Sequence, residues 1–193
     1  MREFVCLVFI SGHAESIDMR PLEHFALAAL PMTAYSLARY HRLPAGSTIL
    51  LLLVATQLPD IIDKPLAWSF GIIPSGRMLA HSLVITASAL VFIYMLGRRR
   101  NKADLAAVFS LGYLSHLLGD FYLILFLGRE YYFFPNLFWP ILPANPDIMP
   151  SFAAHAPGSM RQVVLTVVGF GVVCGYVILD LSRGSDRVAN MGR

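Results

Sequence analysis

The 193-residue sequence predicts an all-α, polytopic membrane protein with about five transmembrane helices. Hydrophobic residues make up 56% of the chain and charged residues only 14%, and the mean hydropathy is +0.62. A soluble domain of this size cannot bury so much apolar surface, whereas a bilayer accepts it. In addition, apolar stretches close to the length of a membrane helix recur along the chain.

The candidate spans differ in how well they fit a membrane helix. A spanning helix needs about 20 apolar residues, with a usual range of about 17–25. The first candidate contains Pro31 and the second is interrupted by Pro59, Asp60 and Asp63, whereas the other three fit the range well. We predict the five spans at residues 22–38, 49–66, 79–96, 105–127 and 163–181.

We expect one transmembrane helical domain over residues 19–183. Residues 1–18 form an N-terminal extension to which no function is assigned, and Met19 is an alternative start. Residues 184–193 would form a cytoplasmic tail. Six prolines between residues 128 and 160 argue against a long helix there, so this connection is predicted to be an ordered lid on the outer interface.

Basic residues follow the first, third and fifth spans and are sparse in the other two connections. The positive-inside rule therefore predicts a cytoplasmic-membrane protein with its N-terminus outside and its C-terminus inside. The densest run, from Arg98 to Lys102, lies between two apolar spans, which favours a cytoplasmic loop over a nucleic-acid patch. The three cytoplasmic regions are marked by Arg39, His41, Arg42, Arg98, Arg99, Arg100, Lys102, Arg183, Arg187 and Arg193.

Histidines and aspartates gather at one level of the predicted membrane domain. They fall on four different spans, all in the outer half of the bilayer. His116 and Asp120 are four residues apart and so share one helix face, and Asp60 and Asp63, three apart, are also roughly on one face. The six residues are His24, Asp60, Asp63, His81, His116 and Asp120.

These residue types inside a membrane indicate a metal site. An isolated ionised carboxylate is costly in hydrocarbon, so such groups are usually paired, bound to metal or exposed to a wet cavity. A divalent cation neutralises two carboxylates while imidazoles complete its shell, and we expect zinc ahead of manganese or magnesium. A bound ion activates water, and a spare carboxylate, Asp60 or Asp63, would be the general base.

Taken singly, some of these residues also fit plainer roles. His81 alone is compatible with a hydrogen-bonded packing role, Asp63 with capping a broken helix, and His24 with a solvated position at the interface. The pair His116 and Asp120 is harder to explain in this way, because both lie within the apolar stretch at 105–127.

Short motifs occur in a characteristic order over residues 22–140. They are His24, Leu58-Pro59-Asp60-Ile61-Ile62-Asp63, Arg77-Met78-Leu79-Ala80-His81-Ser82, Tyr113-Leu114-Ser115-His116-Leu117-Leu118-Gly119-Asp120 and Phe138-Trp139-Pro140. This order resembles the YdjM-like family of membrane-bound, predicted metal-dependent hydrolases. The chain departs from the family pattern at Gly76, where the family has His, at Ala80, where it has Thr, and in a longer acidic motif.

The resemblance implies a metal-site set, with Arg77 and Ser82 supporting the ligands or binding substrate. That set is His24, Asp60, Asp63, His81, His116 and Asp120.

We therefore predict a metal-dependent hydrolase acting at the outer membrane interface on a lipid or lipid-linked substrate. A phosphoester is suitable, with Arg77 or Lys64 as the anion contact. Two alternatives stay open, namely an ion or metal transporter and a non-catalytic membrane interaction protein with a structural metal. The predicted catalytic residues are Asp60, Asp63 and Arg77, and the predicted metal ligands are His24, Asp60, His81, His116 and Asp120.

Overall fold

A computed structural model describes residues 20–128, 131–152 and 160–191 of the chain. Within these ranges the regular secondary structure is all helical, which confirms the all-α part of the prediction. The expected N-terminal extension at residues 1–18 lies outside them. The helices are α2 (Pro21–Tyr40), α3 (Gly46–Lys64), α4 (Leu83–Arg99), α5 (Ala103–Leu127), α6 (Phe134–Leu137) and α7 (Met160–Met191), with shorter helical turns at Pro65–Ser69 and Tyr131–Phe133.

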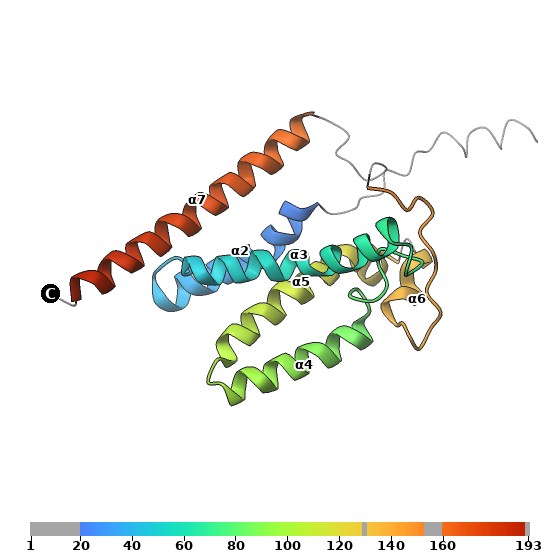
Figure 1. The fold of residues 1–193 in the computed structure, drawn as a ribbon, viewed down its shortest axis with the longest axis horizontal. Coiled ribbons are helices and arrows are strands. Elements are labelled where there is room, and N and C mark those ends of the chain that lie inside the picture. The colour runs from blue at the N-terminus through green and yellow to red at the C-terminus, as the bar shows by residue number, and fades with distance from the viewer. Residues whose placement is uncertain (1–19, 129–130, 153–159, 192–193) are drawn as a thin grey trace, which may run out of the picture.

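Helix α5 is the centre of the arrangement and contacts α2, α3 and α4, while α7 packs on α3 and α2. Figure 1 shows the α2–α3 turn, the α4–α5 turn and the C-terminus at one end of the molecule. At the other end lie α6 and the irregular segments around it. The basic connections that the sequence predicts to be cytoplasmic therefore share one end.

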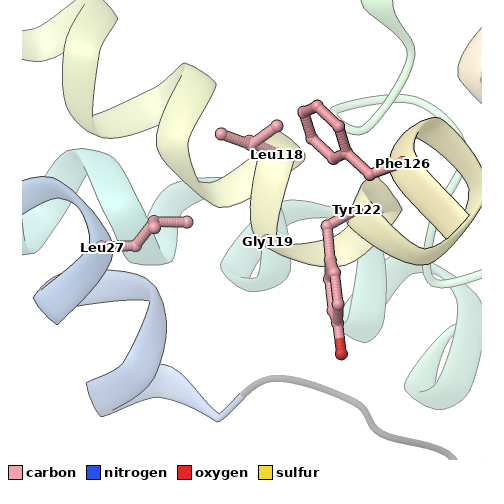
Figure 2. Close-up of a pocket in the computed structure, with 5 residues that line it drawn as sticks. All are labelled: Leu27, Leu118, Gly119, Tyr122 and Phe126. Atoms are coloured by element: carbon pink, nitrogen blue, oxygen red, sulfur yellow. The ribbon is translucent and has the colours of Figure 1, made fainter.

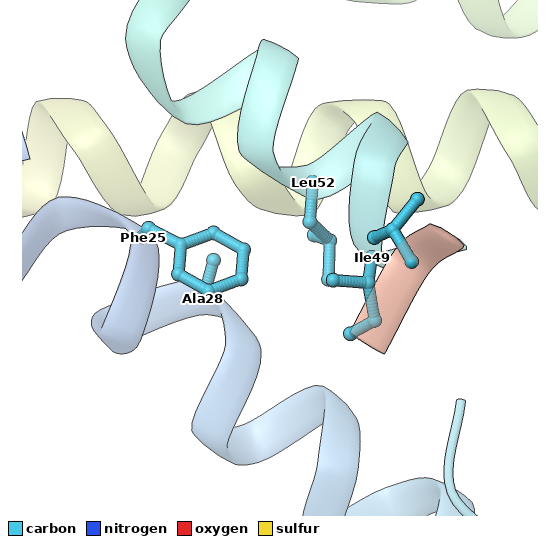
Figure 3. Packing of buried hydrophobic residues seen from close by; sticks show 5 residues of the cluster. Phe25, Ala28, Ile49 and Leu52 are labelled. Atoms are coloured by element: carbon cyan, nitrogen blue, oxygen red, sulfur yellow. The ribbon is translucent and has the colours of Figure 1, made fainter. Parts of the chain in front are cut away.

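An apolar cluster joins α2, α3 and α7 (Figure 3). Its buried members recur at helical spacing in α2 and α3, as expected for helix faces that pack together. The cluster consists of Phe25, Ala28, Ile49, Leu52 and Val177. Close by, the Asp180 carboxylate of α7 accepts a hydrogen bond from the Gly46 amide at the start of α3 (2.6 Å).

Helices α3 and α5 approach closely at Gly112. A Cβ atom at this position would lie 2.8 Å from the Cβ of Ala55, closer than real Cβ atoms come. The absent side chain lets the two backbones come together. His116, one turn further along α5, consequently reaches the backbone carbonyl of Thr56 on α3 with its Nδ1 atom (2.6 Å).

The predicted third span begins too early, because α4 starts only at Leu83. Its N-cap is Ser82, which precedes the helix. The residues before it wrap around the buried carboxylate of Asp63, which accepts the backbone N–H groups of Ala80 (2.9 Å) and His81 (3.2 Å). These N–H groups are thus satisfied by a side chain, and His81 lies in a turn instead of a helix.

Among the described residues, α7 is the one helix that is long and apolar enough to cross a membrane, over Met160–Ser182. That assignment rests on length and composition. Only 6% of the apolar part of α7 is buried against the rest of the protein, so its apolar side chains face outward. The expectation of five spans stays a prediction for the other four helices.

Candidate metal centre

Four side chains from three parts of the chain converge at the end of the molecule opposite the C-terminus. Asp60 lies near the end of α3, His81 in the turn before α4, and His116 and Asp120 on one face of α5. One ligand atom from each lies within 4.8 Å of the ligand atoms of the others. The structure therefore brings together four of the five predicted metal ligands in one group.

Five of the six separations between these ligand atoms are close to the edge of a tetrahedral coordination shell. His81 Nε2 lies 3.2 Å from Asp120 Oδ2 and 3.5 Å from Asp60 Oδ1. His116 Nε2 lies 3.1 Å from His81 Nε2 and 3.7 Å from each of the same two oxygens. Ligand atoms bound at zinc distances around a tetrahedral ion are about 3.3 Å apart. The four atoms thus fit a single ion of this kind.

Hydrogen bonds behind each imidazole turn its Nε2 atom toward the centre. His81 Nδ1 lies 2.9 Å from Asp63 Oδ2, and His116 Nδ1 lies 2.6 Å from the Thr56 carbonyl. Both partners accept hydrogen bonds, so each Nδ1 carries a proton, and each ring in its neutral form presents a lone pair at Nε2. Asp60 Oδ1 has no hydrogen-bond partner among the described residues. Lone pairs converging in this way repel one another unless a proton or a metal cation lies between them.

The carboxylates make the centre attractive to positive charge. Burial lowers the pKa of His81, but its contacts with the carboxylates of Asp120, Asp60 and Asp63 outweigh burial and raise it to about 10. A proton on His81 and a divalent cation are therefore competing ways to neutralise the same group of atoms.

Asp63 lies behind His81, away from the converging ligand atoms. It is fully buried, and its oxygens accept hydrogen bonds from the backbone N–H groups of Met78, Ala80 and His81 and from His81 Nδ1. This predicted catalytic residue thus has both oxygens occupied by the turn that carries His81.

His24 stands beside the four ligands. Its ring stacks on that of His116, with centroids 4.0 Å apart, and its Nε2 atom lies 3.1 Å from Asp120 Oδ1. The two atoms are close enough for an ion pair but are not aligned for a hydrogen bond. Both ring nitrogens of His24 are buried without a hydrogen-bond partner among the described residues. His24, a predicted ligand, is therefore adjacent to the centre and contacts the Asp120 oxygen that is not among the four ligand atoms.

Two cationic side chains bind the carboxylates of the centre from its rim. Arg77 Nε donates to Asp120 Oδ2 (3.2 Å), and Lys64 Nζ donates to Asp60 Oδ2 (2.5 Å). Their side chains are 15% and 25% exposed, more than any side chain of the four ligands. Solvent or substrate thus meets this rim before it meets the imidazoles.

Several supporting residues were not found from the sequence. Thr56 acts through its backbone carbonyl, which no side-chain motif reveals. Tyr113 and Thr86 both donate hydroxyl hydrogen bonds to the Ala80 carbonyl, at 2.8 and 3.1 Å, and so hold the turn before α4. Ser82, which the resemblance placed near the ligands, caps α4 and donates its hydroxyl to the Trp139 carbonyl.

A sequence model of the YdjM inner membrane protein family matches residues 19–183. The chain belongs to this family. The resemblance drawn from the motif order is thereby confirmed, and the protein is an inner membrane protein. All residues of the candidate centre and its rim lie within the matched region of this YdjM family member. Comparisons with curated proteins and with solved structures give no match.

The structure also explains one departure from the family pattern. A Cβ atom at Gly76 would lie 3.1 Å from three atoms of the Trp68 indole ring. The indole therefore packs against position 76, and a side chain there would require Trp68 to shift by a few tenths of an ångström.

Proposed function

We propose that the protein is a membrane-embedded, metal-dependent hydrolase. The observation that supports this best is the convergence of two Nε2 atoms and two carboxylate oxygens at 3.1–3.7 Å, with both imidazoles oriented from behind. Two nitrogen and two oxygen ligands suit zinc, ahead of manganese or magnesium. Such an ion supplies Lewis acidity and a water of lowered pKa.

The residues of the chain would divide the remaining work. Asp60, His81, His116 and Asp120 would hold the ion, and His24, next to Asp120 Oδ1, would extend the ligand set. Asp63 is better suited to orienting His81 than to removing a proton, because its oxygens already accept hydrogen bonds. Asp60 would bind the ion through Oδ1, so its Oδ2 atom, which also contacts Lys64, is the carboxylate oxygen left to take a proton from an attacking water.

The charges of the centre and its rim favour an anionic substrate. With neutral histidines, the three carboxylates and two cations leave one net negative charge, and a divalent ion reverses this to one net positive charge. A phosphodiester group carries one negative charge and would restore neutrality. The groups counted are Asp60, Asp63, Asp120, Lys64 and Arg77.

An apolar groove beside the centre supports a lipid or lipid-linked substrate. Figure 2 shows this groove between α2 and α5, and its volume is about 260 Å³. Its lining begins next to the centre, since Leu27 lies one turn after His24 and Gly119 directly precedes Asp120. The other lining residues are Leu118, Tyr122 and Phe126. A volume of this size suits one acyl or prenyl chain, since pockets for whole drug-sized ligands usually start near 300 Å³.

The exposed side chains support a multi-pass arrangement in the bilayer. In α4, which has 17 residues, only Thr86 and Leu90 are buried, and large apolar residues such as Val91 and Phe92 are exposed. Extended apolar surface of this kind suits contact with lipid. We propose that α2 to α5 span the membrane together with α7, with the N-terminus outside and the C-terminus inside.

Metal analysis of purified protein tests the hydrolase proposal. Wild-type protein should retain about one zinc or manganese ion per chain and hydrolyse a phosphodiester lipid. Asp120→Ala should lose both properties, because it removes a ligand oxygen together with one of the two carboxylates that neutralise the ion, and Arg77 loses its contact with that carboxylate beside the ion. The matched control is Asp180→Ala, a carboxylate that binds the Gly46 amide at the far end of α3 and should leave both properties intact. A metal-free wild type with the same activity as Asp120→Ala would refute the proposal.

The transporter receives less support from the structure, and the structural metal would use the same four ligands as the proposed hydrolase. A transporter needs a polar path through the other half of the membrane, but the cluster of Phe25, Ala28, Ile49, Leu52 and Val177 fills the space between α2, α3 and α7. Metal or proton flux through the protein in liposomes would support the transporter alternative. A purely structural metal predicts a closed shell, which would show as zinc that exchanges no ligand with added anions.

A further inference from the structure

One carboxylate joins the two irregular parts of the chain near the candidate centre. These parts are residues 65–82, here called the connector, and residues 131–152, here called the outer segment. Asp147 of the outer segment reaches the connector at several points. We propose that Asp147 positions the cationic side chains at the rim of the centre and thereby sets its affinity for an anionic substrate group.

Asp147 makes three side-chain hydrogen bonds to the connector. Its Oδ2 atom accepts from Trp68 Nε1 (2.5 Å) and from the Gly76 amide (2.7 Å), and its Oδ1 atom accepts from the Ser75 hydroxyl (2.7 Å). The Asp147 amide in turn donates to the Pro74 carbonyl (3.0 Å). The outer segment is thus joined to the connector, and so to the rim of the centre, by hydrogen bonds that both the side chain and the backbone of Asp147 make.

The hydrogen bonds of Ser75, Trp68 and Gly76 require that both side-chain oxygens of residue 147 accept hydrogen bonds, as those of a carboxylate do. The Ser75 hydroxyl oxygen accepts from the Arg77 amide (3.1 Å) and from Asn136 Nδ2 (3.1 Å), which uses both of its lone pairs. Its proton can therefore only be donated onward, to Asp147 Oδ1. Since Trp68 and Gly76 also donate, an amide at position 147 would set its NH₂ group against another donor in either orientation.

This network reaches both rim cations. On one side, the Trp68 indole that donates to Asp147 lies under Lys64, with Nζ 5.7 Å from the ring centroid. On the other side, Ser75 and Gly76 immediately precede Arg77, whose guanidinium lies 5.4 Å from the centroid of the Phe133 ring and contacts Asp120. Asp147 is therefore the shared support of Lys64 and Arg77.

The inference rests on the proposed function, because it concerns anion binding at the same centre. Lys64 and Arg77 would each give a charge-assisted hydrogen bond to an anion above the metal. Loss of their positions should weaken anion affinity by about tenfold or more, since a contact to a charged group is worth about that much. The four metal ligands lie on α3, α5 and the turn held by Asp63, so metal binding should be nearly unchanged.

The test uses the full-length, zinc-loaded protein in detergent micelles. Zinc content and the affinity for inorganic phosphate are measured for wild type, Asp147→Asn and Asp147→Glu, with Asp180→Asn as the matched control. We expect Asp147→Asn to keep its zinc and bind phosphate about tenfold or more weakly. Glutamate only accepts hydrogen bonds and should recover part of this loss, and Asp180→Asn should match wild type. A parallel titration uses short-chain phosphatidylglycerol in place of phosphate. If Asp147→Asn weakens phosphatidylglycerol binding more than phosphate binding, the anion is a lipid headgroup, and if it weakens phosphate binding more, the anion is free phosphate.

Three results would overturn the inference. The first is an Asp147→Asn protein that binds phosphate as tightly as wild type. The second is equal loss of zinc and phosphate in both Asp147 variants, which would mean general structural damage. The third is a zinc-loaded wild type without phosphate affinity. By contrast, Asp147-dependent phosphate binding without hydrolysis of any phosphoester would refute the hydrolase alone.

Discussion

At the scale of single residues, the candidate centre depends on where each imidazole places its proton. His81 and His116 face each other through Nε2 because their Nδ1 atoms are bonded to Asp63 and to the Thr56 carbonyl. This pattern, in which an acceptor behind the ring fixes the tautomer, is typical of metal-ligating histidines. The two acceptors differ, since one is a buried side chain and the other a backbone group.

Asp63→Asn tests the orienting role at this scale. An amide keeps one acceptor oxygen but sets an NH₂ group against the N–H groups of the turn or against His81 Nδ1. We expect zinc affinity to fall by about 10–100-fold, the usual effect of losing a partner behind a metal ligand. The measurement is zinc competition with a chromophoric chelator.

Asp104→Asn is the control for this substitution, because Asp104 is exposed at the start of α5. It makes the same chemical change away from the centre. If Asp63→Asn and Asp104→Asn bound zinc equally well, the orienting role of Asp63 would be wrong.

At the scale of helices, the close approach of α3 and α5 brings the ligands into reach of one another. Gly112 allows the approach, and the His116–Thr56 hydrogen bond depends on it. Gly112→Ala would place its methyl carbon 2.8 Å from Ala55 Cβ and force the helices apart. We expect a loss of about 1–3 kcal/mol in stability and weaker zinc binding, measured by thermal unfolding in detergent and by chelator competition.

Gly171→Ala is the control for this element. A Cβ atom at Gly171 meets nothing within 4 Å, so the same substitution should be neutral or slightly stabilising, as alanine favours helix over glycine. Equal thermal stability of the two variants would contradict the view that the α3–α5 spacing is set at Gly112.

At the scale of the whole molecule, the ends of the bundle differ in character. The end that holds the α2–α3 and α4–α5 turns carries the basic connections, including Arg98 to Lys102 (Figure 1). The other end carries the candidate centre and the outer segment. An inner membrane protein with this polarity would place the centre at the outer face.

Thiol labelling tests this orientation. In a protein with Cys6 and Cys174 replaced by serine, we introduce a cysteine at Ile148, which is exposed in the outer segment, or at Asn101 in the α4–α5 turn. An impermeant maleimide should label Ile148→Cys in intact spheroplasts and Asn101→Cys only after permeabilisation. The reverse pattern would place the centre on the cytoplasmic side.

The sequence by itself determined the features that composition and local spacing control. High hydropathy predicted a membrane protein, and apolar stretches predicted α2, α3, α5 and α7 to within a few residues, apart from the C-terminal extension of α7. The four-residue spacing of His116 and Asp120 predicted that both face one centre, because helical periodicity is a local property. The order of the motifs identified the family.

Only the tertiary structure decided the start of α4, the position of Asp63 behind His81 and the place of Asp147 at the rim. In each case a carboxylate binds backbone or side-chain donors that lie far from it along the chain. Asp63 takes donors 15 to 18 residues away, and Asp147 takes donors 71 to 79 residues away. Which donors a buried carboxylate meets depends on how the helices pack, and helix packing is not encoded in any local pattern.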